Sequence, residues 1–307
     1  MTIPLTEPAA RRRLRSRLLV TGSVLDVPEL AERVIDPEIL LAVSGASRLG
    51  DLRSRDVEAL PFPRSEDETR AASVIGAALR GALERRTRLW VGLIDEGQVS
   101  GLRMMLGDEQ LHQIGPAGPD GRVPVAVNPR ELAAAWCVRT RAYLQAMRDN
   151  LAGIDALHLP GRLLRALREA GVPVRERPSL VRLLRNPVVV AYLVVLVYSA
   201  LRALPVTFVP GFHGHVAILW GIDLLTAIPY TWGIIAMVAG RRLWIRGLGL
   251  LTAVVTFVAP YVYFWTHGHG YPWFVDLVIA VMILSAVGLE GVRWARDAAV
   301  AAGLRRR

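Results

Sequence analysis

Four apolar segments in the C-terminal part of the chain constrain its fold more than any other feature. They run over residues 187–209, 215–239, 243–265 and 273–291. A helix needs about 20 apolar residues to cross a hydrocarbon core of ~30 Å, so each segment is close to the length of a transmembrane span. The loops between them are too short to hold another element. This pattern predicts two helical hairpins in an all-α four-helix transmembrane bundle.

The rest of the chain has a different composition. Although 52% of all residues are hydrophobic, the long apolar runs lie almost wholly in the C-terminal part. We predict that residues 1–178 form a water-soluble α/β (α+β) domain and that residues 179–186 form a basic amphipathic connector. The transmembrane domain then spans residues 187–292, and residues 293–307 form a basic tail.

The distribution of arginine predicts the orientation in the membrane. The chain contains no lysine, so all 37 basic residues are arginine, and the formal net charge is +10. Positive charge in short loops is retained on the cytoplasmic side. The loops and flanks on one predicted side contain Arg182, Arg185, Arg241, Arg242, Arg246, Arg293, Arg296 and Arg305 to Arg307, whereas the two loops on the other side contain none. We therefore expect a multi-pass plasma-membrane protein with both termini in the cytoplasm.

Residues 1–178 show local signals of helix and strand. Ser65 to Glu68 form a capping box before a helical repeat of apolar residues that ends at Leu83. Residues 89–94 predict a strand that turns at residues 95–97 into further short apolar stretches, as in an antiparallel meander. Asn128 and Pro129 predict the start of a helix that continues to Met147.

Two short amphipathic stretches place leucines beside arginines, at residues 161–170 and 179–185. Such helices are typical of a membrane surface, where arginines reach anionic lipid headgroups. The lipid bilayer and its anionic headgroups are thus expected partners. Because the excess positive charge lies largely near the membrane segments and the termini, no nucleic-acid partner is needed to explain it.

Common enzyme signatures are missing from the sequence. It has no glycine-rich phosphate loop, no His-Glu-x-x-His zinc helix and no Gly-x-Ser-x-Gly nucleophile elbow. The single cysteine, Cys137, excludes an internal disulfide and is expected to pack as a small apolar residue on a helix. These absences favour a protein that is not an enzyme.

A repeated tripeptide is the motif that points most directly to chemistry. His213-Gly214-His215 and His267-Gly268-His269 lie in the two predicted outer loops, and Asp223 and Asp276 follow inside the next spans. Four imidazoles on one face of a bundle would suit a divalent metal ion or haem. The two aspartates would then complete or orient the ligand set. Loop histidines in an ordinary interfacial turn are the simpler interpretation.

Charged residues within the spans are a second indication of function. An ionisable side chain within a membrane helix costs several kcal/mol of insertion free energy unless it is paired or hydrated. Asp223 and Asp276 lie within apolar segments, and Arg202 lies near the outer end of the first. We therefore predict that one of the aspartates pairs with Arg202. Prolines inside the spans, with Tyr230, Tyr261 and Tyr263 near them, favour a pocket in the bundle.

Three functional hypotheses follow. The first is an integral membrane accessory, sensing or assembly protein whose cytosolic domain binds a protein partner or a second copy of the chain. The second is a metal- or haem-dependent membrane enzyme or redox protein that uses the two His-Gly-His motifs. The third is a small transporter subunit that acts as an oligomer, with Arg202, Asp223 and Asp276 along the path.

Overall fold

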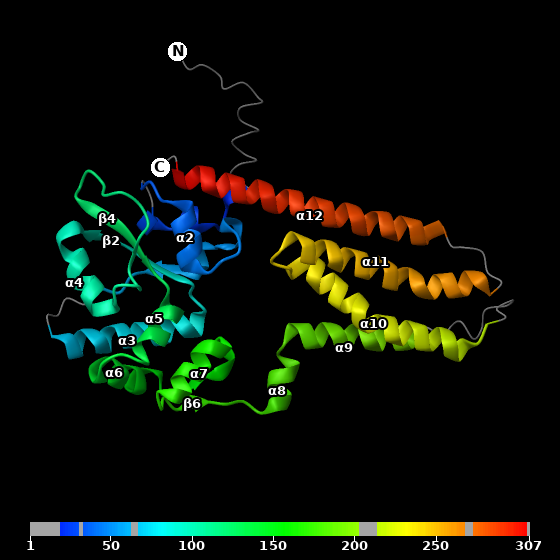
Figure 1. Ribbon diagram of the computed structural model, residues 1–307, viewed down its shortest axis with the longest axis horizontal. Coiled ribbons are helices and arrows are strands. Elements are labelled where there is room, and N and C mark those ends of the chain that lie inside the picture. The colour runs from blue at the N-terminus through cyan, green and yellow to red at the C-terminus, as the bar shows by residue number, and fades with distance from the viewer. Residues whose placement is uncertain (1–18, 31–32, 63–66, 203–213, 268–272, 306–307) are drawn as a thin grey trace, which may run out of the picture. The chain divides into compact units, whose positions relative to one another are not determined.

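The chain forms two compact units (Figure 1). The computed structural model describes residues 19–30, 33–62, 67–202, 214–267 and 273–305 of the 307-residue chain. We call residues Met1–Arg177 together with Arg293–Arg307 the mixed-sheet unit, and residues Pro178–Val292 the helical unit. The α/β character predicted for the N-terminal part is confirmed, and so is the helical character of the C-terminal part.

A four-stranded mixed sheet organises the mixed-sheet unit. Its strands, in the spatial order β1-β2-β4-β3, are Val57–Ala59, Leu89–Asp95, Arg122–Val127 and His112–Gln113. β1 and β2 are parallel and are connected through helix α3 (Glu68–Arg85), whereas β4 is antiparallel to both β2 and β3. A second, two-stranded sheet pairs β5 (Ile154–Asp155) with β6 (Val174–Arg175) in parallel.

Both faces of the four-stranded sheet are buried. Successive side chains of a strand point to opposite faces. Trp90 and Ile94 of β2 pack in one apolar core, and Leu89 and Val91 pack in a second core on the other face. The predicted strand at residues 89–94 is confirmed. Its sequence reads as a nearly continuous apolar run, with little alternation, because both faces are covered.

Helix α3 follows the predicted apolar repeat. Asp67 is its N-cap, and the Asp67 side chain accepts a hydrogen bond from the Thr69 backbone N–H at 3.0 Å. The helix buries Ile75, Leu79 and Leu83 against the sheet. Ser65, the expected cap, lies outside the described residues. The acidic residues predicted at the helix start therefore do cap it, through Asp67.

The expected turn at residues 95–97 is wrong. Glu96 begins helix α4 (Glu96–Leu106) directly after β2. Gly97 and Gly101 lower the intrinsic helix propensity of this stretch, so its sequence resembles a loop. Burial of Leu102 and Leu106, which are one helical turn apart, stabilises the helix through tertiary packing.

The helix predicted from Pro129 to Met147 is two helices. Asn128 caps α5 (Pro129–Trp136) as expected, because its side chain accepts a hydrogen bond from the Arg130 N–H. The chain then breaks and continues as α6 (Arg141–Leu151). At the break, the Arg139 guanidinium donates to the carbonyl groups of Met104 and Met105. The turn brings the Trp136 and Tyr143 rings to 4.8 Å between centroids, in the core.

The two arginine-rich amphipathic stretches behave differently. α7 (Gly161–Glu169) buries Leu163 and Leu167 in the core of the mixed-sheet unit, so the membrane-surface interpretation is wrong for this helix. α8 (Ser179–Leu184) buries none of its side chains. Its leucines remain exposed, and its contact with lipid headgroups stays a prediction.

Shorter elements complete the second core of the mixed-sheet unit. They include α2 (Pro37–Ser44), capped by Asp36, whose side chain accepts from the Glu38 N–H at 2.8 Å. The described residues also form five short 3-10 segments, η1 to η5, at Val24–Asp26, Pro28–Leu30, Leu49–Asp51, Ser54–Asp56 and Ala156–His158. Leu25, Leu30 and Leu40 from these elements are buried beside β2.

The C-terminal stretch is part of this second core, in contrast to the basic tail predicted for residues 293–307. Helix α12 (Trp273–Arg305) continues to Arg305, and its residues from Arg293 belong to the mixed-sheet unit. Val300 and Leu304 are 0% and 1% exposed. The Leu304 carbonyl accepts a hydrogen bond from the Ile35 N–H at 3.0 Å.

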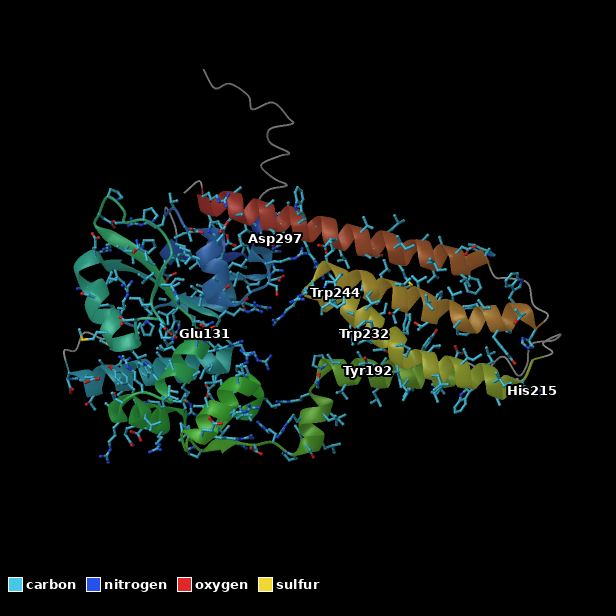
Figure 2. All side chains as sticks on the ribbon, in the orientation of Figure 1. Glu131, Tyr192, His215, Trp232, Trp244 and Asp297 are labelled. Carbon is cyan, nitrogen blue, oxygen red and sulfur yellow. The ribbon has the colours of Figure 1, made fainter. Side chains whose placement is uncertain are left out.

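A second contact comes from Asp297, labelled on α12 in Figure 2. Its carboxylate accepts a hydrogen bond from the Gly50 N–H at 2.8 Å and lies 3.7 Å from the Arg48 guanidinium. Val300 and Leu304, which are four residues apart, therefore face the core. The Asp297 carboxylate connects the same helix to the segment around η3 through its hydrogen bond with Gly50.

Within its described residues, the helical unit contains three helices long and apolar enough to cross a membrane. They are α10 (Val216–Ala239), α11 (Leu243–Thr266) and the apolar part of α12. α9 (Pro187–Arg202) is also apolar but shorter, and residues 203–213 after it lie outside the described residues. The bounds of α10 and α11 agree with the predicted spans to within one residue. The first predicted span, at residues 187–209, stays a prediction.

α10 and α11 approach until their backbones touch. A Cβ atom added at Gly233 would lie 2.7 Å from the Gly249 carbonyl oxygen, and one at Gly249 would lie 2.7 Å from the Gly233 carbonyl oxygen. Ala236 and Ala253 are buried beside them. Small residues allow such close approach, which is how helices associate where lipid replaces water.

We expect Gly233→Ala to destabilise the helical unit by about 1–3 kcal/mol, the usual cost of overpacking. The added methyl group would clash with the α11 backbone, which cannot move aside as a flexible side chain can. Thermal unfolding of the full chain in lipid nanodiscs measures the effect. Gly221→Ala is the matched control on the same helix, because nothing lies within 4 Å of its added Cβ. Equal melting temperatures for the two variants would contradict the close contact.

We also expect Leu304→Ala to lower the free energy of unfolding of the mixed-sheet unit by about 2–5 kcal/mol, as for other buried leucines. Ala302→Ser, on the exposed side of the same turn, should leave it nearly unchanged. Denaturant unfolding followed by tryptophan fluorescence compares the two. A solvated tail would give no difference between them.

Candidate functional site

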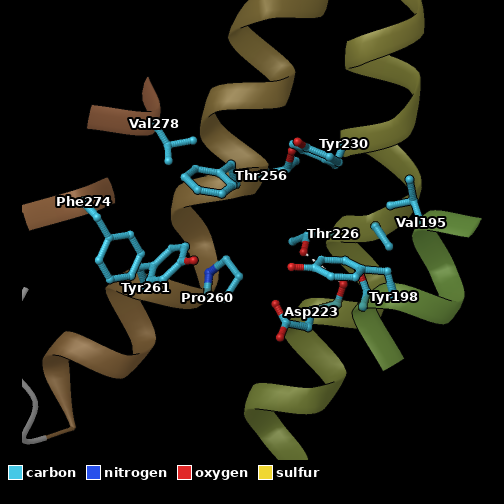
Figure 3. A pocket seen from close by; sticks show the side chains of 13 residues that line it. Val195, Tyr198, Asp223, Thr226, Tyr230, Thr256, Pro260, Tyr261, Phe274 and Val278 are labelled. Atoms are coloured by element: carbon cyan, nitrogen blue, oxygen red, sulfur yellow. Dashed lines mark hydrogen bonds between the residues drawn. The ribbon is translucent and has the colours of Figure 1, made fainter. Parts of the chain in front are cut away.

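The helical unit contains a partly open cavity of about 320 Å³ between its helices (Figure 3). Its lining comes from α9, α10, α11 and the start of α12. The residues that line it are Val195, Tyr198, Ser199, Asp223, Thr226, Ala227, Tyr230, Thr256, Phe257, Pro260, Tyr261, Phe274 and Val278. More than half of these side chains carry a hydroxyl or carboxyl group, in helices that are otherwise strongly apolar.

Asp223 provides the carboxylate of the cavity. It lies two turns into α10 and is only 5% exposed. Figure 3 shows its carboxyl group directed from α10 toward Pro260 and Tyr261 of α11. A carboxylate is costly to bury in apolar surroundings unless it is paired or hydrated.

The two threonines of the lining hydrogen-bond to their own helices. Thr226 donates to the Ile222 carbonyl at 2.8 Å, and Thr256 donates to the Thr252 carbonyl at 2.7 Å. Such bonds satisfy the hydroxyl proton without a partner from another helix. The hydroxyl oxygens still have acceptor capacity on the cavity side.

A row of aromatic rings forms one wall. The ring centroids of Tyr230 and Phe257 are 6.5 Å apart, those of Phe257 and Tyr261 are 5.3 Å apart, and those of Tyr261 and Phe274 are 6.0 Å apart. The last pair meets edge to face, at 82°. These contacts connect α10, α11 and α12. Rings at such spacing support one another, which holds the wall in a defined shape.

Proline modifies the backbone beside the cavity. Pro229 lies inside α10, and Pro260 lies inside α11, where it is buried and lines the cavity. Proline has no N–H, so the Thr256 carbonyl receives no hydrogen bond from residue 260. Irregular backbone of this kind is tolerated in membrane helices where it faces protein or a polar cavity.

Comparison with known proteins gave no match to a family model, a curated protein or a solved structure. The geometry and chemistry of the cavity are therefore the basis for a functional proposal.

The predicted histidine site falls partly outside the described residues. His213 and His269 belong to segments that the structure does not describe. His215 is exposed at the N-cap of α10, where Figure 2 labels it. His267 follows α11; its Nδ1 lies 2.8 Å from the Tyr263 carbonyl oxygen, and the two rings are 4.1 Å apart.

Within the described ranges, no three or more His, Cys, Asp or Glu side chains form a group that could hold a metal ion. The metal or haem site at the two tripeptides stays a prediction. The two aspartates of the loose repeat have different surroundings. Asp223 is buried in the cavity, whereas Asp276 is exposed near the start of α12 and does not line it.

The charge pairing in the helical unit includes residues that the sequence did not single out. Arg246 was expected in the loop before the third span, yet it lies in the first turn of α11, only 8% exposed. Its guanidinium contacts the Glu290 carboxylate of α12 at 3.2 Å. Glu290 is an acid near the end of the last apolar segment. That position was the sequence signal from which this ion pair could have been predicted. The pairing of Arg202 with an aspartate stays a prediction, because the Arg202 side chain lies outside the described residues.

The ionisable groups of the mixed-sheet unit have structural roles. The hydrogen bond from Arg85 lowers the pKa of Glu58, and the hydrogen bond from the Leu157 N–H, helped by Arg177, lowers the pKa of Asp155. The ion pairs Arg85–Glu58 and Arg177–Asp155 each connect segments far apart in the sequence. Burial raises the pKa of the Cys137 thiol to about 11. This thiol is therefore protonated at neutral pH and unsuited to act as a nucleophile.

We expect Glu290→Gln to destabilise the protein by about 1–3 kcal/mol, because the buried guanidinium of Arg246 loses its charged partner. Replacing both partners, as in Arg246→Met with Glu290→Leu, should recover most of that loss, since an apolar pair leaves no charge unmatched. Thermal unfolding in nanodiscs measures both. Gly291→Ala is the control next to Glu290, because nothing lies within 4 Å of its added Cβ. A double variant less stable than Glu290→Gln alone would contradict the pairing.

Proposed function

We propose that this chain is an integral membrane sensing protein that binds a small molecule in the cavity around Asp223. The observation that carries the proposal is the combination of a buried carboxylate and several hydroxyl groups inside an apolar helical unit. Ionisable residues in membrane segments are rare because they are costly, and they commonly mark binding or transport sites. A cavity of about 320 Å³ lies at the lower end of the range that holds small-molecule ligands.

Helix α12 supports a sensing role. Phe274 and Val278 near its start line the cavity, and Val300 and Leu304 near its end belong to the core of the mixed-sheet unit. One helix thus contributes to both places. A ligand that shifts or restrains the start of α12 would bias the packing of its end. In this proposal the mixed-sheet unit converts occupancy of the cavity into a change that a protein partner or a second copy of the chain reads.

The proposed setting is the plasma membrane, with several spans and both termini in the cytoplasm. Arginines before α9, between α10 and α11, and after the apolar part of α12 support this orientation through the positive-inside tendency. The arginines of α8, Arg182 with the following Arg185, would then meet anionic lipid headgroups. The mixed-sheet unit would face the cytoplasm.

A transporter subunit is the second candidate. A buried carboxylate at some depth in α10, beside a helix with Pro260 inside it, is also an arrangement that transporters use along a substrate path. The two candidates differ in a measurable property. A sensing protein binds without net flux, whereas a transporter moves its substrate into sealed liposomes, and neutralising Asp223 abolishes that flux.

The sensing function predicts coupling between the cavity and the end of α12. Val278→Trp, which fills the cavity, should change amide hydrogen exchange at Gly50 and Ile35 by about fivefold or more, the low end of typical coupling free energies. These two amides report on α12 because they donate to Asp297 and Leu304. The measurement uses the full chain in nanodiscs, with hydrogen exchange followed by mass spectrometry.

Leu277→Trp is the matched control for this experiment. Leu277 neighbours Val278 on α12 but is 53% exposed and does not line the cavity. It should leave exchange at Gly50 and Ile35 unchanged. Equal exchange in the Val278→Trp variant and the original protein would overturn the sensing role of α12.

A further inference from the structure

We propose that Arg86, Arg88 and Arg130 of the mixed-sheet unit form a binding site for a phosphate monoester group, on a soluble compound or on a lipid headgroup. We call these three residues the arginine cluster. The inference goes beyond the proposed function, because the arginine cluster belongs to the mixed-sheet unit and does not involve the cavity. Its basis is where the strands place the three side chains, which partners these side chains have, and what their placement costs.

The strand ends bring the arginine cluster together. Arg88 directly precedes β2, and its backbone N–H donates to the carbonyl of Asp56, the residue before β1, at 2.7 Å. β4 is antiparallel to β2, so β4 ends beside the start of β2 and leads into α5 at the same end of the sheet. There the guanidinium of Arg130 donates to the Arg86 carbonyl at 3.2 Å. The three arginines therefore lie at one end of the four-stranded sheet.

The ion-paired groups of the mixed-sheet unit have structural roles, but the arginine cluster differs from them. Among the described residues, none of its guanidinium groups forms an ion pair with an aspartate or a glutamate. The neighbouring Arg85, by contrast, donates two hydrogen bonds to the Glu58 carboxylate, at 2.5 and 2.9 Å. The Nε atom of Arg130 is buried and has no acceptor in the part of the chain that the structure describes. The arginine cluster therefore has donors that an anion could use.

The positions of Arg86 and Arg130 are unfavourable for an arginine. Arg86 is the C-cap of α3 at a φ of 64°, a left-handed conformation that glycine adopts more readily. Arg130 lies in the first turn of α5, where the helix dipole favours acidic side chains. Burial, with the charges of Arg88 and Arg86, lowers the pKa of the Arg130 guanidinium. A bound anion would offset the repulsion between these charges.

The net charge of the arginine cluster fits a dianion. Asp56 is the acid whose charge acts on Arg130, and its carboxylate accepts a hydrogen bond from the Arg53 N–H at 3.1 Å. Three guanidinium groups and this carboxylate leave two positive charges. Glu131 follows Arg130 in the chain, but adjacent residues do not share a helix face. A phosphate monoester has a charge of about −1.5 to −2 at neutral pH, and guanidinium groups bind its oxygens in pairs.

Equilibrium dialysis of labelled glycerol 3-phosphate against the full chain in phosphatidylcholine nanodiscs tests the proposal. Glycerol at the same ionic strength is the control probe, because it lacks only the phosphate group. We expect saturable binding of glycerol 3-phosphate and no saturable binding of glycerol. Absence of saturable glycerol 3-phosphate binding, or equal binding of glycerol, would overturn the site.

Variants locate the binding in the arginine cluster. Arg88→Gln should weaken the binding of glycerol 3-phosphate at least fivefold. Arg86→Gly should do the same without lowering the melting temperature, because glycine adopts this backbone conformation without strain, and it keeps the test decisive if Arg88→Gln does not fold. Arg70→Gln is the matched control, since it removes the same charge from an exposed arginine about 24 Å away along α3, at ~1.5 Å per residue. Equal weakening by Arg70→Gln, or unchanged binding in the two cluster variants, would contradict the assignment.

Phosphatidic acid added to the nanodiscs distinguishes the two sources of the phosphate group, because it presents glycerol 3-phosphate as a lipid headgroup. Phosphatidylglycerol, an anionic lipid without a phosphate monoester, is the control for surface charge. If phosphatidic acid weakens glycerol 3-phosphate binding at least fivefold more than phosphatidylglycerol does, the site takes a lipid headgroup. Equal effects of the two lipids assign it to a soluble compound. Failure of the site would leave the sensing proposal intact, because hydrogen exchange in the Val278→Trp variant needs no phosphate.

Discussion

The backbone contact between α10 and α11 is the constraint on which the helical unit depends. Gly233 and Gly249 allow the two helices to touch near the end of α10 and the beginning of α11. Toward the other ends of the same helices, Asp223, Tyr230 and Tyr261 surround a cavity. Small residues thus lie at the close contact, and bulky side chains with polar groups line the cavity along the same two helices.

Much of the fold follows from the sequence where a local signal is strong. The α10 and α11 spans and the α3 repeat are recognised because long apolar runs and caps depend on few distant contacts. The helix at residues 96–106 was missed because its glycines resemble a turn and only the burial of Leu102 and Leu106 stabilises it. The break after Trp136 depends on Arg139 reaching carbonyl groups of α4, and no local pattern reveals that contact.

The candidate site was predictable only in part. Asp223 is visible in the sequence because an acid inside an apolar segment is conspicuous, and Tyr230 and Tyr261 stand beside prolines. The aromatic row is not visible, because Phe257 and Phe274 look like ordinary apolar residues of two spans. Their role depends on which helices are neighbours. The ion pair of Arg246 with Glu290 was not predicted for the same reason, because the two residues are far apart in the chain and adjacent in the structure.

The burial of the end of α12 in the mixed-sheet unit has a consequence for biosynthesis. Val300 and Leu304 are translated after the apolar segments, yet they complete a core whose other members begin at Val24. The N-terminal part therefore leaves the ribosome early but cannot close this core until the apolar segments have been made. A chain that stops before residue 300 would leave Leu25 and Ile35 without their covering helix and expose them to quality-control proteases. The fold in this way makes synthesis of the chain through Leu304 a condition for the stability of the mixed-sheet unit.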